Sequence, residues 1–557
     1  GVVPIAAGQS EEALKTINGL LRAGECVCLF PEGAISRNGH LGKFHTGYER
    51  TLEGVERGVI VPFYLHGLWG SSLSRAGEGL RAARTPDFRR RLIVAFGDAL
   101  PLQTGAKALK QKVMELSLSA WRAYGESLES LPLAWLRAVK RDPRRQAIAT
   151  VADGVLSGGE LVGRVSALVS RLPVGPGERV GLLLPPGVDA VTAVLAALWR
   201  GLTLVPLDPG ADSADWSGRL RRSGVRRVLT SRAVLAGLRE ADVDAATALA
   251  DLLCLEDLRP GSGWLHRLPF HLLPAGIFYR LAGRAVANTQ PAALLFDASG
   301  EAAVLTHRNL MVNGRQLSDV LNPRLDDVLV CSQPLDTAAG LVVGLLMPLV
   351  EGLPVLCHPA AGTACFGAGS GAGFNTGFDA TGLARAIARF DGTVLSADPA
   401  LLQALAEDPQ VHPLLLENLR LVLCLGGSLD EARRQSFALR FGCSIYEGFG
   451  GVATTALASL NIPDAVDFRD WKVQQGCLPG SAGMPLPGTL LRIVGEGGEE
   501  APLGQSGELQ IGGAQVAAGR LDGIGHSGVT EDECGLRWLA TGRRGSLNEE
   551  GFLLLVE

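Results

Sequence analysis

The earliest residues in the chain that are suited to chemistry form the run Phe30-Pro31-Glu32-Gly33. A carboxylate and a glycine follow an apolar stretch, and the cations Arg37 and Lys43 come soon after them. Backbone N–H groups at such a turn, together with nearby cations, are typical of a phosphate-binding site. The same run also fits an ordinary turn after a strand, so the tetrapeptide alone leaves both interpretations open.

The surrounding sequence favours the phosphate site. Three segments, in order, resemble the glycerophospholipid acyltransferase family: Phe30-Pro31-Glu32-Gly33, Gly42-Lys43-Phe44-His45-Thr46-Gly47 and Val59-Ile60-Val61-Pro62. The resemblance covers residues 1–125. It implies an α/β domain that transfers an acyl group, with the phosphate of a lysophospholipid acceptor bound by Glu32, Gly33, Arg37 and Lys43.

The chain departs from this family in its catalytic motif. The family uses His-x-x-x-x-Asp, in which the His is the general base for the acceptor hydroxyl. None of the nine His residues has an Asp five positions later, and the family places the motif upstream of the Phe-Pro-Glu-Gly run. The chain also starts at Gly1 without a Met. We therefore expect an N-terminally truncated acyltransferase domain without a catalytic residue in this chain.

A second series of motifs lies further along and resembles the acyl-adenylate-forming ligases, which are AMP-binding enzymes. In chain order they are Leu198-Trp199-Arg200-Gly201, Val205-Pro206-Leu207-Asp208-Pro209, Leu305-Thr306-His307-Arg308-Asn309-Leu310, Pro334-Leu335-Asp336, Cys424-Leu425-Gly426-Gly427-Ser428, Tyr446-Glu447-Gly448-Phe449-Gly450, Gly483-Met484-Pro485-Leu486-Pro487-Gly488, Gly507-Glu508-Leu509 and Trp538-Leu539-Ala540-Thr541-Gly542. The resemblance covers residues 147–557 and implies a large N-terminal domain without the small C-terminal lid. By the same resemblance, the nucleotide-binding remnant comprises Gly426, Gly427, Tyr446, Glu447, Gly448, Phe449, Gly450 and Thr541.

Four positions differ from what ATP chemistry in that family requires. The phosphate loop around Ser299 is short and carries two carboxylates, and no Lys occurs between Lys140 and Lys472. Carboxylates beside a triphosphate repel it. The remaining changes are Ala453 at the Mg²⁺ ligand, Arg543 at the ribose carboxylate and Asp336 at a usual His beside the acyl pocket. We therefore expect a degenerate ligase without a metal site, with ATP and Mg²⁺ as cofactors only if this half is active.

Periodicity predicts the elements that position these residues. In residues 1–125 it predicts helices at 11–23 and 107–124, with strands at 26–30, 59–65 and 92–96. The charged, Pro-punctuated stretch 126–146 is predicted to be a linker. From residue 147, predicted strands at 179–184, 204–207, 227–229, 292–296, 327–331, 355–357, 393–396 and 421–425 alternate with helices such as 188–200 and 381–389. This alternation predicts mostly parallel sheets, followed by a β-rich subdomain after Gly476.

Composition sets further limits. The chain has 557 residues, of which 47% are hydrophobic and 20% charged, which is typical of a globular protein. Residues 1–145 carry a net charge of +7, which suits an anionic partner such as phosphate or a lipid headgroup. No run of 18 uncharged apolar residues predicts a membrane-spanning helix. The aromatic stretch 264–281 fits either a membrane surface or an insertion packed on its own domain, and the Gly-rich stretch 362–377 is predicted to be a surface loop.

The order of the two resemblances is typical of the bifunctional acyl-ACP synthetase/2-acylglycerophosphoethanolamine acyltransferases. It implies phospholipid metabolism: a fatty acyl group passes from acyl carrier protein or acyl-CoA to a lysophospholipid. The expected location is the cytoplasmic face of the inner membrane, bound peripherally to the membrane surface, without a nucleic-acid partner. Two alternatives stay open, namely a functional ATP-dependent acyl-ACP or acyl-CoA ligase and a non-catalytic acyl- or lipid-binding scaffold.

Overall fold

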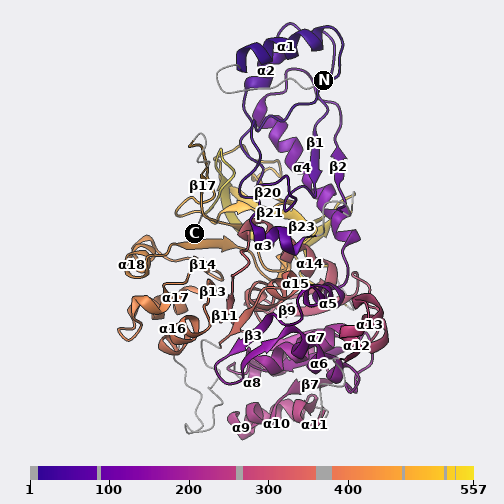
Figure 1. Cartoon of the computed structure of the whole chain (residues 1–557), viewed down its shortest axis with the longest axis vertical. Coiled ribbons are helices and arrows are strands. Elements are labelled where there is room, and N and C mark those ends of the chain that lie inside the picture. The colour runs from indigo at the N-terminus through magenta and orange to yellow at the C-terminus, as the bar shows by residue number, and fades with distance from the viewer. Residues whose placement is uncertain are drawn as a thin grey trace.

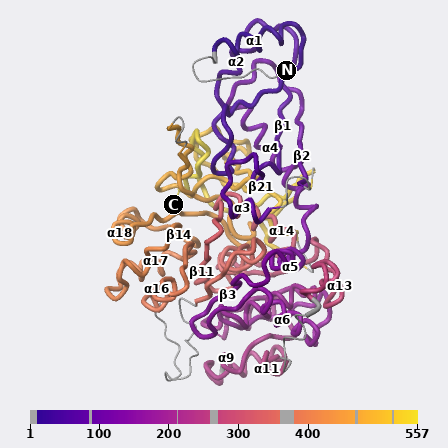
Figure 2. Tube along the Cα trace, in the orientation of Figure 1, coloured from indigo at the N-terminus to yellow at the C-terminus, as the bar shows by residue number. Residues whose placement is uncertain are grey.

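The computed structural model describes residues 10–84, 90–211, 213–258, 268–358, 379–466, 471–519, 523–533 and 535–556. Residues 10–127, here called the N-terminal part, stand at one end of a larger body (Figure 1). The C-terminal strands of the body return to lie beside the lower half of the N-terminal part, against its long helix α4 (Figure 2). The N-terminal part and the C-terminal strands of the body are therefore in contact.

The N-terminal part is organised around the amphipathic helix α4. Its buried residues Leu109, Val113 and Trp121 are spaced by multiples of four and form one apolar face, which packs on a two-stranded antiparallel sheet. In that sheet Phe63 pairs with Phe96 and His66 pairs with Ile93. The elements are α1 (Ser10–Arg22), α2 (Gly47–Thr51), β1 (Phe63–His66), α3 (Glu78–Ala83), β2 (Ile93–Phe96) and α4 (Ala106–Ser127).

Both predicted helices of this part are confirmed, as are its second and third predicted strands. The predicted strand 26–30 is wrong, because this segment forms no ladder. The physical reason is that β1 and β2 pair only with each other among the described strands, so the apolar segment has no strand beside it to complete its hydrogen bonds.

The body contains two large sheets. The first has the order β10-β9-β6-β5-β7-β8 and is parallel except for the β9–β10 hairpin. Its strands are β5 (Arg179–Leu183), β6 (Thr203–Leu207), β7 (Arg227–Thr230), β8 (Asp251–Cys254), β9 (Pro291–Phe296) and β10 (Ala302–Thr306). All five residues of β6 are buried, which is typical of a parallel strand covered on both faces.

The second sheet has the order β19-β16-β15-β14-β13-β11-β12-β3-β4, with a parallel centre from β15 to β3. Its strands are β3 (Gln146–Thr150), β4 (Gly154–Ser157), β11 (Leu329–Cys331), β12 (Val355–Cys357), β13 (Val394–Ala397), β14 (Leu421–Cys424), β15 (Ile445–Phe449), β16 (Ser459–Leu460) and β19 (Met484–Pro485). The predicted parallel arrangement of residues 147–425 is thereby confirmed.

The predicted β-rich end is confirmed as well. Its strands are β17 (Ala465–Val466), β18 (Val473–Gln474), β20 (Thr489–Val494), β21 (Gly507–Gly513), β22 (Val529–Glu531), β23 (Arg537–Leu547) and β24 (Leu553–Val556). The helices of the body are α5 (Leu131–Arg141), α6 (Gly158–Val169), α7 (Val188–Arg200), α8 (Ser213–Ser223), α9 (Arg232–Gly237), α10 (Glu240–Thr247), α11 (Leu255–Leu258), α12 (Leu268–Leu272), α13 (Ala275–Ala282), α14 (His307–Leu321), η2 (Ala339–Leu346), α15 (Met347–Glu351), α16 (Ala380–Arg389), α17 (Pro399–Glu407), η3 (Pro413–Leu416), α18 (Glu431–Phe441) and η4 (Val452–Thr454).

The stretch 126–146, predicted to be a linker, contains the ordered helix α5 instead. Pro132 lies in the first turn of α5, where its missing N–H costs nothing, and Trp135 and Leu136 are fully buried in the core of the body. The charges that suggested a linker belong to one edge of an amphipathic helix, and its apolar residues decide its position.

The aromatic stretch 264–281 is described from residue 268 onward. Phe270, Phe278 and Tyr279 are buried, and Tyr279 stacks on Trp199 of α7 with ring centroids 5.8 Å apart. The described aromatic rings therefore pack on the chain's own body, while Trp264 lies outside the described residues. The Gly-rich stretch 362–377 also lies outside them. Within the described ranges, no helix combines the length and the apolar character that a membrane crossing requires.

A buried group of charges joins the N-terminal part to the body. Arg84, which follows α3, lies 2.6 Å from Asp319 of α14 and 2.7 Å from Glu351 of α15. Arg315 of α14 lies 2.7 Å from Glu351, whose side chain is fully buried. Burial alone would raise the pKa of Glu351, but Arg315 and Arg84 hold it below its ordinary value. We call Arg84, Arg315, Asp319 and Glu351 the buried ion-pair cluster.

Replacing Arg84 tests this cluster. We expect Arg84→Met to lower the free energy of unfolding by about 3 kcal/mol, because Asp319 loses its cation while it stays buried. Urea unfolding followed by circular dichroism measures the change. Arg433→Met is the matched control: it breaks an ion pair with Asp430 in which both side chains are 54% exposed, so a change within about 0.5 kcal/mol is expected. Equal midpoints for Arg84→Met and the native protein would contradict the assignment.

Helix α14 begins with a buried polar turn. The side chain of Thr306 caps the backbone N–H of Asn309, and Asn309 donates to the carbonyls of Ala514 and Val516. His307 lies at the start of this helix and is fully buried, and neither of its ring nitrogens has a hydrogen-bond partner. Burial lowers the pKa of His307 to about 3.

The buried state of His307 predicts a pH dependence. Its folded pKa lies below the unfolded value, so the unfolded chain binds the extra proton as pH falls below about 6.5. The contribution of His307 to stability is therefore complete above pH 6.5 and is lost towards pH 3, at about 1.4 kcal/mol per pH unit. We expect His307→Phe to flatten the slope of unfolding free energy between pH 7 and pH 5 by that amount. The exposed His45→Gln serves as the control, and an unchanged slope in His307→Phe would refute the prediction.

Candidate functional site

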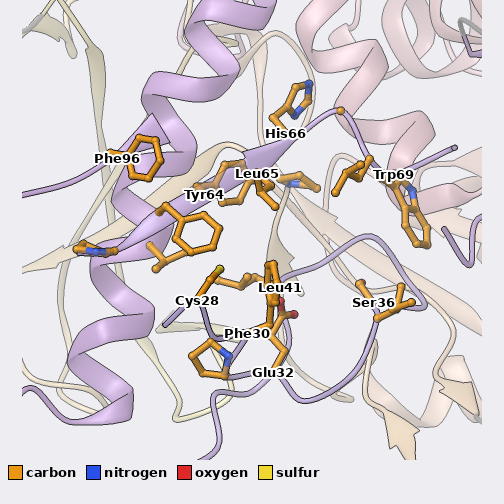
Figure 3. A pocket seen from close by; sticks show the side chains of 18 of the residues that line it. Cys28, Phe30, Glu32, Ser36, Leu41, Tyr64, Leu65, His66, Trp69 and Phe96 are labelled. Atoms are coloured by element: carbon orange, nitrogen blue, oxygen red, sulfur yellow. The ribbon is translucent and has the colours of Figure 1, made fainter. Parts of the chain in front are cut away.

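A cavity with a volume of about 1850 Å³ lies where the N-terminal part meets the body. Residues 24–41, β1 and α4 form its wall on one side, and α5 and α14 form it on the other. Figure 3 shows Cys28, Phe30, Glu32 and Leu41 facing Tyr64 and Leu65 of β1. Typical small-molecule sites measure about 300–1,000 Å³, so this cavity has room for a long ligand.

Glu32 is the predicted site residue that the structure places on the cavity wall. Its Oε2 accepts a hydrogen bond from the N–H of Gly42 at 2.7 Å, which closes the loop between them. Burial raises the pKa of Glu32, although this bond and the charge of Lys110 on α4 oppose the effect. The carboxyl group is therefore easier to protonate than an exposed one, and once protonated it donates a hydrogen bond.

The other three predicted phosphate ligands lie beside this wall but not on it. Gly33 takes the left-handed conformation (φ 62°) and donates its N–H to Phe30, which makes the turn after Pro31. The N–H of Arg37 donates to Gln474 of β18 at 2.8 Å, so the β-rich end holds this loop. Lys43 is exposed. The structure thus brings Glu32 to the cavity, and a joint phosphate site formed by all four residues stays a prediction.

Three polar residues that sequence reasoning missed also line the cavity, namely His40, Tyr64 and His66. His40 is buried with Nε2 unpartnered, and burial lowers the pKa of both His40 and His66 to about 4. The ring of His66 packs on Trp121 and Tyr124, with centroids 4.6 and 4.4 Å away. Burial raises the pKa of Tyr64 to about 12. These groups are neutral at pH 7. The only sequence signal for His66 was its position at the end of an apolar strand.

The motifs of the second series lie in the body, and Pro487 of one of them lines this cavity. At the predicted phosphate loop, β9 and β10 join in a tight turn over Asp297–Glu301. The N–H of Asp297 donates to the carbonyl of Glu301, that of Gly300 to the carbonyl of Asp297, and that of Glu301 to Oδ1 of Asp297. Ser299 Oγ also donates to Asp297, at 2.6 Å. These N–H groups are therefore hydrogen-bonded within the turn, whereas a phosphate-binding loop directs its N–H groups at the ligand.

Both carboxylates of this turn face the loop that carries His526. Asp297 lies 3.6 Å and Glu301 3.7 Å from ring nitrogens of His526, and the N–H of Ser527 donates to Glu301 at 2.9 Å. Backbone and hydroxyl hydrogen bonds from Ser527 lower the pKa of Glu301, which keeps it ionised. Two negative charges at this turn oppose a triphosphate, so the residues present here do not fit Mg²⁺-ATP in the manner of the family.

Asp336 forms an ion pair of its own. Its Oδ2 lies 2.8 Å from Nη1 of Arg219 on α8, and Arg219 also lies 2.9 Å from Asp215. Burial raises the pKa of Asp336, with Arg219 opposing the shift. Arg219 and its neighbour Arg222 both lie over the ring of Phe296, at 5.8 and 5.0 Å. This arrangement ties α8 to the β9–β10 turn.

Structural roles account for several residues of the predicted nucleotide-binding remnant. Glu447 lies 2.6 Å from Arg434 and accepts the N–H of Leu429 at 2.8 Å. A side chain at Gly448 or Gly450 would collide with the segment 456–460, because an added Cβ at Gly450 would lie 2.1 Å from the carbonyl of Ala456. Tyr446 and Phe449 are half-buried along β15. Backbone packing therefore requires these glycines whether or not a nucleotide binds.

The remaining predicted positions are spread over neighbouring elements. Gly426 (φ 93°) and Gly427 follow β14, and Thr541 Oγ1 donates to the carbonyl of Leu509 at 2.8 Å. Ala453 is buried in η4, and its carbonyl accepts from Ala517, next to the Ala518–Val304 bridge that leads to β10. Arg543 is exposed on β23. Nucleotide binding by these residues stays a prediction. Within the described ranges, no three His, Cys, Asp or Glu residues form a group that could hold a metal.

Comparison with known proteins supports the fold of the body. Among curated proteins, the chain is 28% identical to a sulfoacetate–CoA ligase of Cupriavidus necator over 69% of this chain and 68% of that protein. It is 24% identical to a long-chain-fatty-acid–CoA ligase of Escherichia coli O6:H1 over 70% and 69%. Among solved structures, a benzoate CoA ligase from Burkholderia xenovorans LB400 superposes with a TM-score of 0.59 at 20% identity, covering 77% of this chain and 80% of that chain.

Two family models match the chain. The model described as acyltransferase matches residues 1–66, which contain Glu32 and many of the other residues that line the cavity. The model described as AMP-binding enzyme matches residues 136–274 and 301–520, more than half of the chain, and it starts within α5. The expected adenylate-forming α/β architecture is thus confirmed, and the chain belongs to the AMP-binding enzyme family.

Proposed function

We propose that this protein handles fatty acyl groups and that its N-terminal part transfers an acyl group from acyl carrier protein or acyl-CoA to a lysophospholipid. The observation that carries the proposal is the cavity of about 1850 Å³ with Glu32 on its wall. Most of its lining residues are aliphatic or aromatic, as a long acyl chain requires. The acyltransferase match to residues 1–66 supports the same assignment.

In this reaction the acceptor hydroxyl attacks the carbonyl carbon of a thioester, and the thiol leaves with the proton. The residues of this chain contribute binding and orientation. Glu32 is suited to donate a hydrogen bond to a phosphate oxygen when protonated, and the buried neutral rings of His40 and His66 are suited to accept hydrogen bonds from hydroxyl groups.

The proposal includes a location and a set of partners. The net charge of +7 in residues 1–145 attracts anionic headgroups. Large apolar side chains, among them Phe30, Val59, Leu73 and Phe96, are exposed on the N-terminal part. Both features support a peripheral position on the cytoplasmic face of the inner membrane, where lysophospholipid is available.

A second candidate is ATP-dependent activation of a carboxylic acid as a CoA or acyl carrier protein thioester. Membership of the AMP-binding family favours it, and so do the relatives named as acid–CoA ligases. The β9–β10 turn argues against it, because its N–H groups are bound within the turn and its carboxylates oppose a triphosphate. We therefore propose that the body has lost this reaction and serves the acyl-handling part as a binding module.

Isotope exchange between pyrophosphate and ATP separates the two candidates. With palmitate, Mg²⁺ and saturating ATP, we expect no fatty-acid-dependent exchange above background, because the turn at Asp297–Glu301 cannot neutralise the departing pyrophosphate. A long-chain-fatty-acid–CoA ligase assayed in parallel is the positive control. Robust exchange by this protein would establish the second candidate and overturn the loss of ligase chemistry.

The role of Glu32 predicts a pH-dependent affinity for lysophosphatidylethanolamine, whose phosphodiester keeps one charge near neutral pH. A protonated Glu32 donates to the phosphate, so binding by the native protein should weaken as pH rises through the raised pKa of this group. Glu32→Gln keeps a donor at all pH values and should bind with little pH dependence. Glu32→Ala should bind about tenfold more weakly, in line with the loss of one charge-assisted hydrogen bond.

Equilibrium dialysis with labelled lipid measures these affinities. Glu12→Gln, an exposed carboxylate on α1, is the matched control and should retain the native pH profile. If Glu32→Ala binds as tightly as the native protein, Glu32 has no part in recognising the headgroup.

A further inference from the structure

The cavity does not end within the N-terminal part, because two helices of the body complete its wall. Ala134, Arg137 and Arg141 contribute from α5, while Met311 and Arg315 contribute from α14. Trp121 and Tyr124 of α4 line the same cavity. A ligand that fills the whole cavity therefore contacts both family-matched regions of the chain, for example at Glu32 and Arg315.

Helix α14 presents different residues to its two sides. Met311, Arg315 and Asp319, spaced four apart, line the cavity. Asn313 and Gln316 lie on another side and donate hydrogen bonds to the carbonyls of Leu457 and Pro487 in the C-terminal segments. These bonds hold the helix in place, so the cavity-facing residues have a defined position.

The arginines at this end of the cavity differ in how their donors are used. Arg84 binds Glu351, Asp319 and Ser318, and Arg141 donates to the carbonyls of Ala82, Ala83 and Glu351. Arg315 gives Nη1 to Glu351 at 2.7 Å, while its Nε is buried without a hydrogen-bond partner. Its side chain is 14% exposed and lines the cavity. Arg315 therefore places part of its guanidinium at the cavity, on a side chain that Glu351 holds in position.

Charge favours an anion at this position. Arg84, Arg137, Arg141 and Arg315 line this end, against Glu129 and Asp319. Arg137 pairs with Glu129 near the surface, and Arg84 pairs with Asp319. Glu351 lies behind the wall and is shared between Arg84 and Arg315. An anionic head with a long chain would place its charge at Arg315 and its methylenes along the apolar wall of α4 and β1.

We propose that the cavity is a composite binding site for a long-chain anionic amphiphile, in which the N-terminal part holds the acyl chain and Arg315 of the AMP-binding body binds the carboxylate or phosphate head. This site rests on the proposed acyl-handling function and adds that the body recognises the lipid head. The AMP-binding fold thereby contributes to lipid binding through a helix remote from the β9–β10 turn.

Binding of three sixteen-carbon probes tests the composite site: palmitate, hexadecyl phosphate and uncharged hexadecanol. Displacement of a fluorescent fatty acid gives each affinity. Arg315→Met should weaken palmitate and hexadecyl phosphate about tenfold or more and leave hexadecanol within about twofold, because only the charged heads use the guanidinium. A larger loss for hexadecyl phosphate than for palmitate would identify a phosphate head as the preferred anion, and the reverse would identify a carboxylate.

Two further variants keep the test decisive. Arg315→Lys retains the charge opposite Glu351 but loses the planar fork, so it should fold normally and still bind both anions more weakly. Ala134→Leu narrows the cavity and should weaken all three probes alike. Arg433→Met, which removes an exposed arginine on α18, is the control and should match the native protein. Equal losses of palmitate and hexadecanol in Arg315→Met, or no loss in either Arg315 variant, would overturn the proposal.

The outcome is independent of the proposed transfer reaction. Palmitate binding that depends on Arg315, together with no binding of lysophosphatidylethanolamine, would support the composite site and contradict acyl transfer to that acceptor. Lysophosphatidylethanolamine binding that depends on Glu32, together with no effect of Arg315 on any anionic probe, would support the transfer function and refute the composite site.

Discussion

The buried ion-pair cluster of Arg84, Arg315, Asp319 and Glu351 is the constraint on which the relation between the two regions depends. Its members come from the N-terminal part and from α14 and α15 of the body, and Glu351 is fully buried. Charges removed from water are stable only with partners at short range, so they permit few arrangements of α3, α14 and α15. The cluster therefore determines how the acyltransferase-like region is placed against the AMP-binding body.

This placement creates the cavity and decides its chemistry. Because α14 and α5 close one side, an apolar space in the N-terminal part acquires a cationic end. Near β1, burial lowers the pKa of His40 and His66, so both rings are neutral, and it raises the pKa of Glu32. A mainly apolar wall with arginines at one end suits a long-chain anionic amphiphile better than a small polar substrate.

Several motif residues of the body have structural roles. The backbone of Ala456 leaves no room for a side chain at Gly450, and Arg434 pairs with Glu447, so these motif residues have structural roles. The β9–β10 turn is a tight hairpin whose carboxylates lie near His526 and accept hydrogen bonds from Ser527.

The sequence by itself determined the parallel sheets, the β-rich end, helices α1, α4, α7 and α16, and the two family resemblances, because these depend on periodicity and on motif order. It also placed Glu32, which follows an apolar run. It misassigned residues 26–30, because a strand forms only where a neighbouring strand can pair with it. It also misassigned residues 126–146, because burial of their apolar face outweighs their exposed charges and makes them a helix. Only the tertiary structure brought His40, His66 and Arg315 to one cavity, because their convergence depends on contacts between segments more than 200 residues apart, which local pattern does not encode.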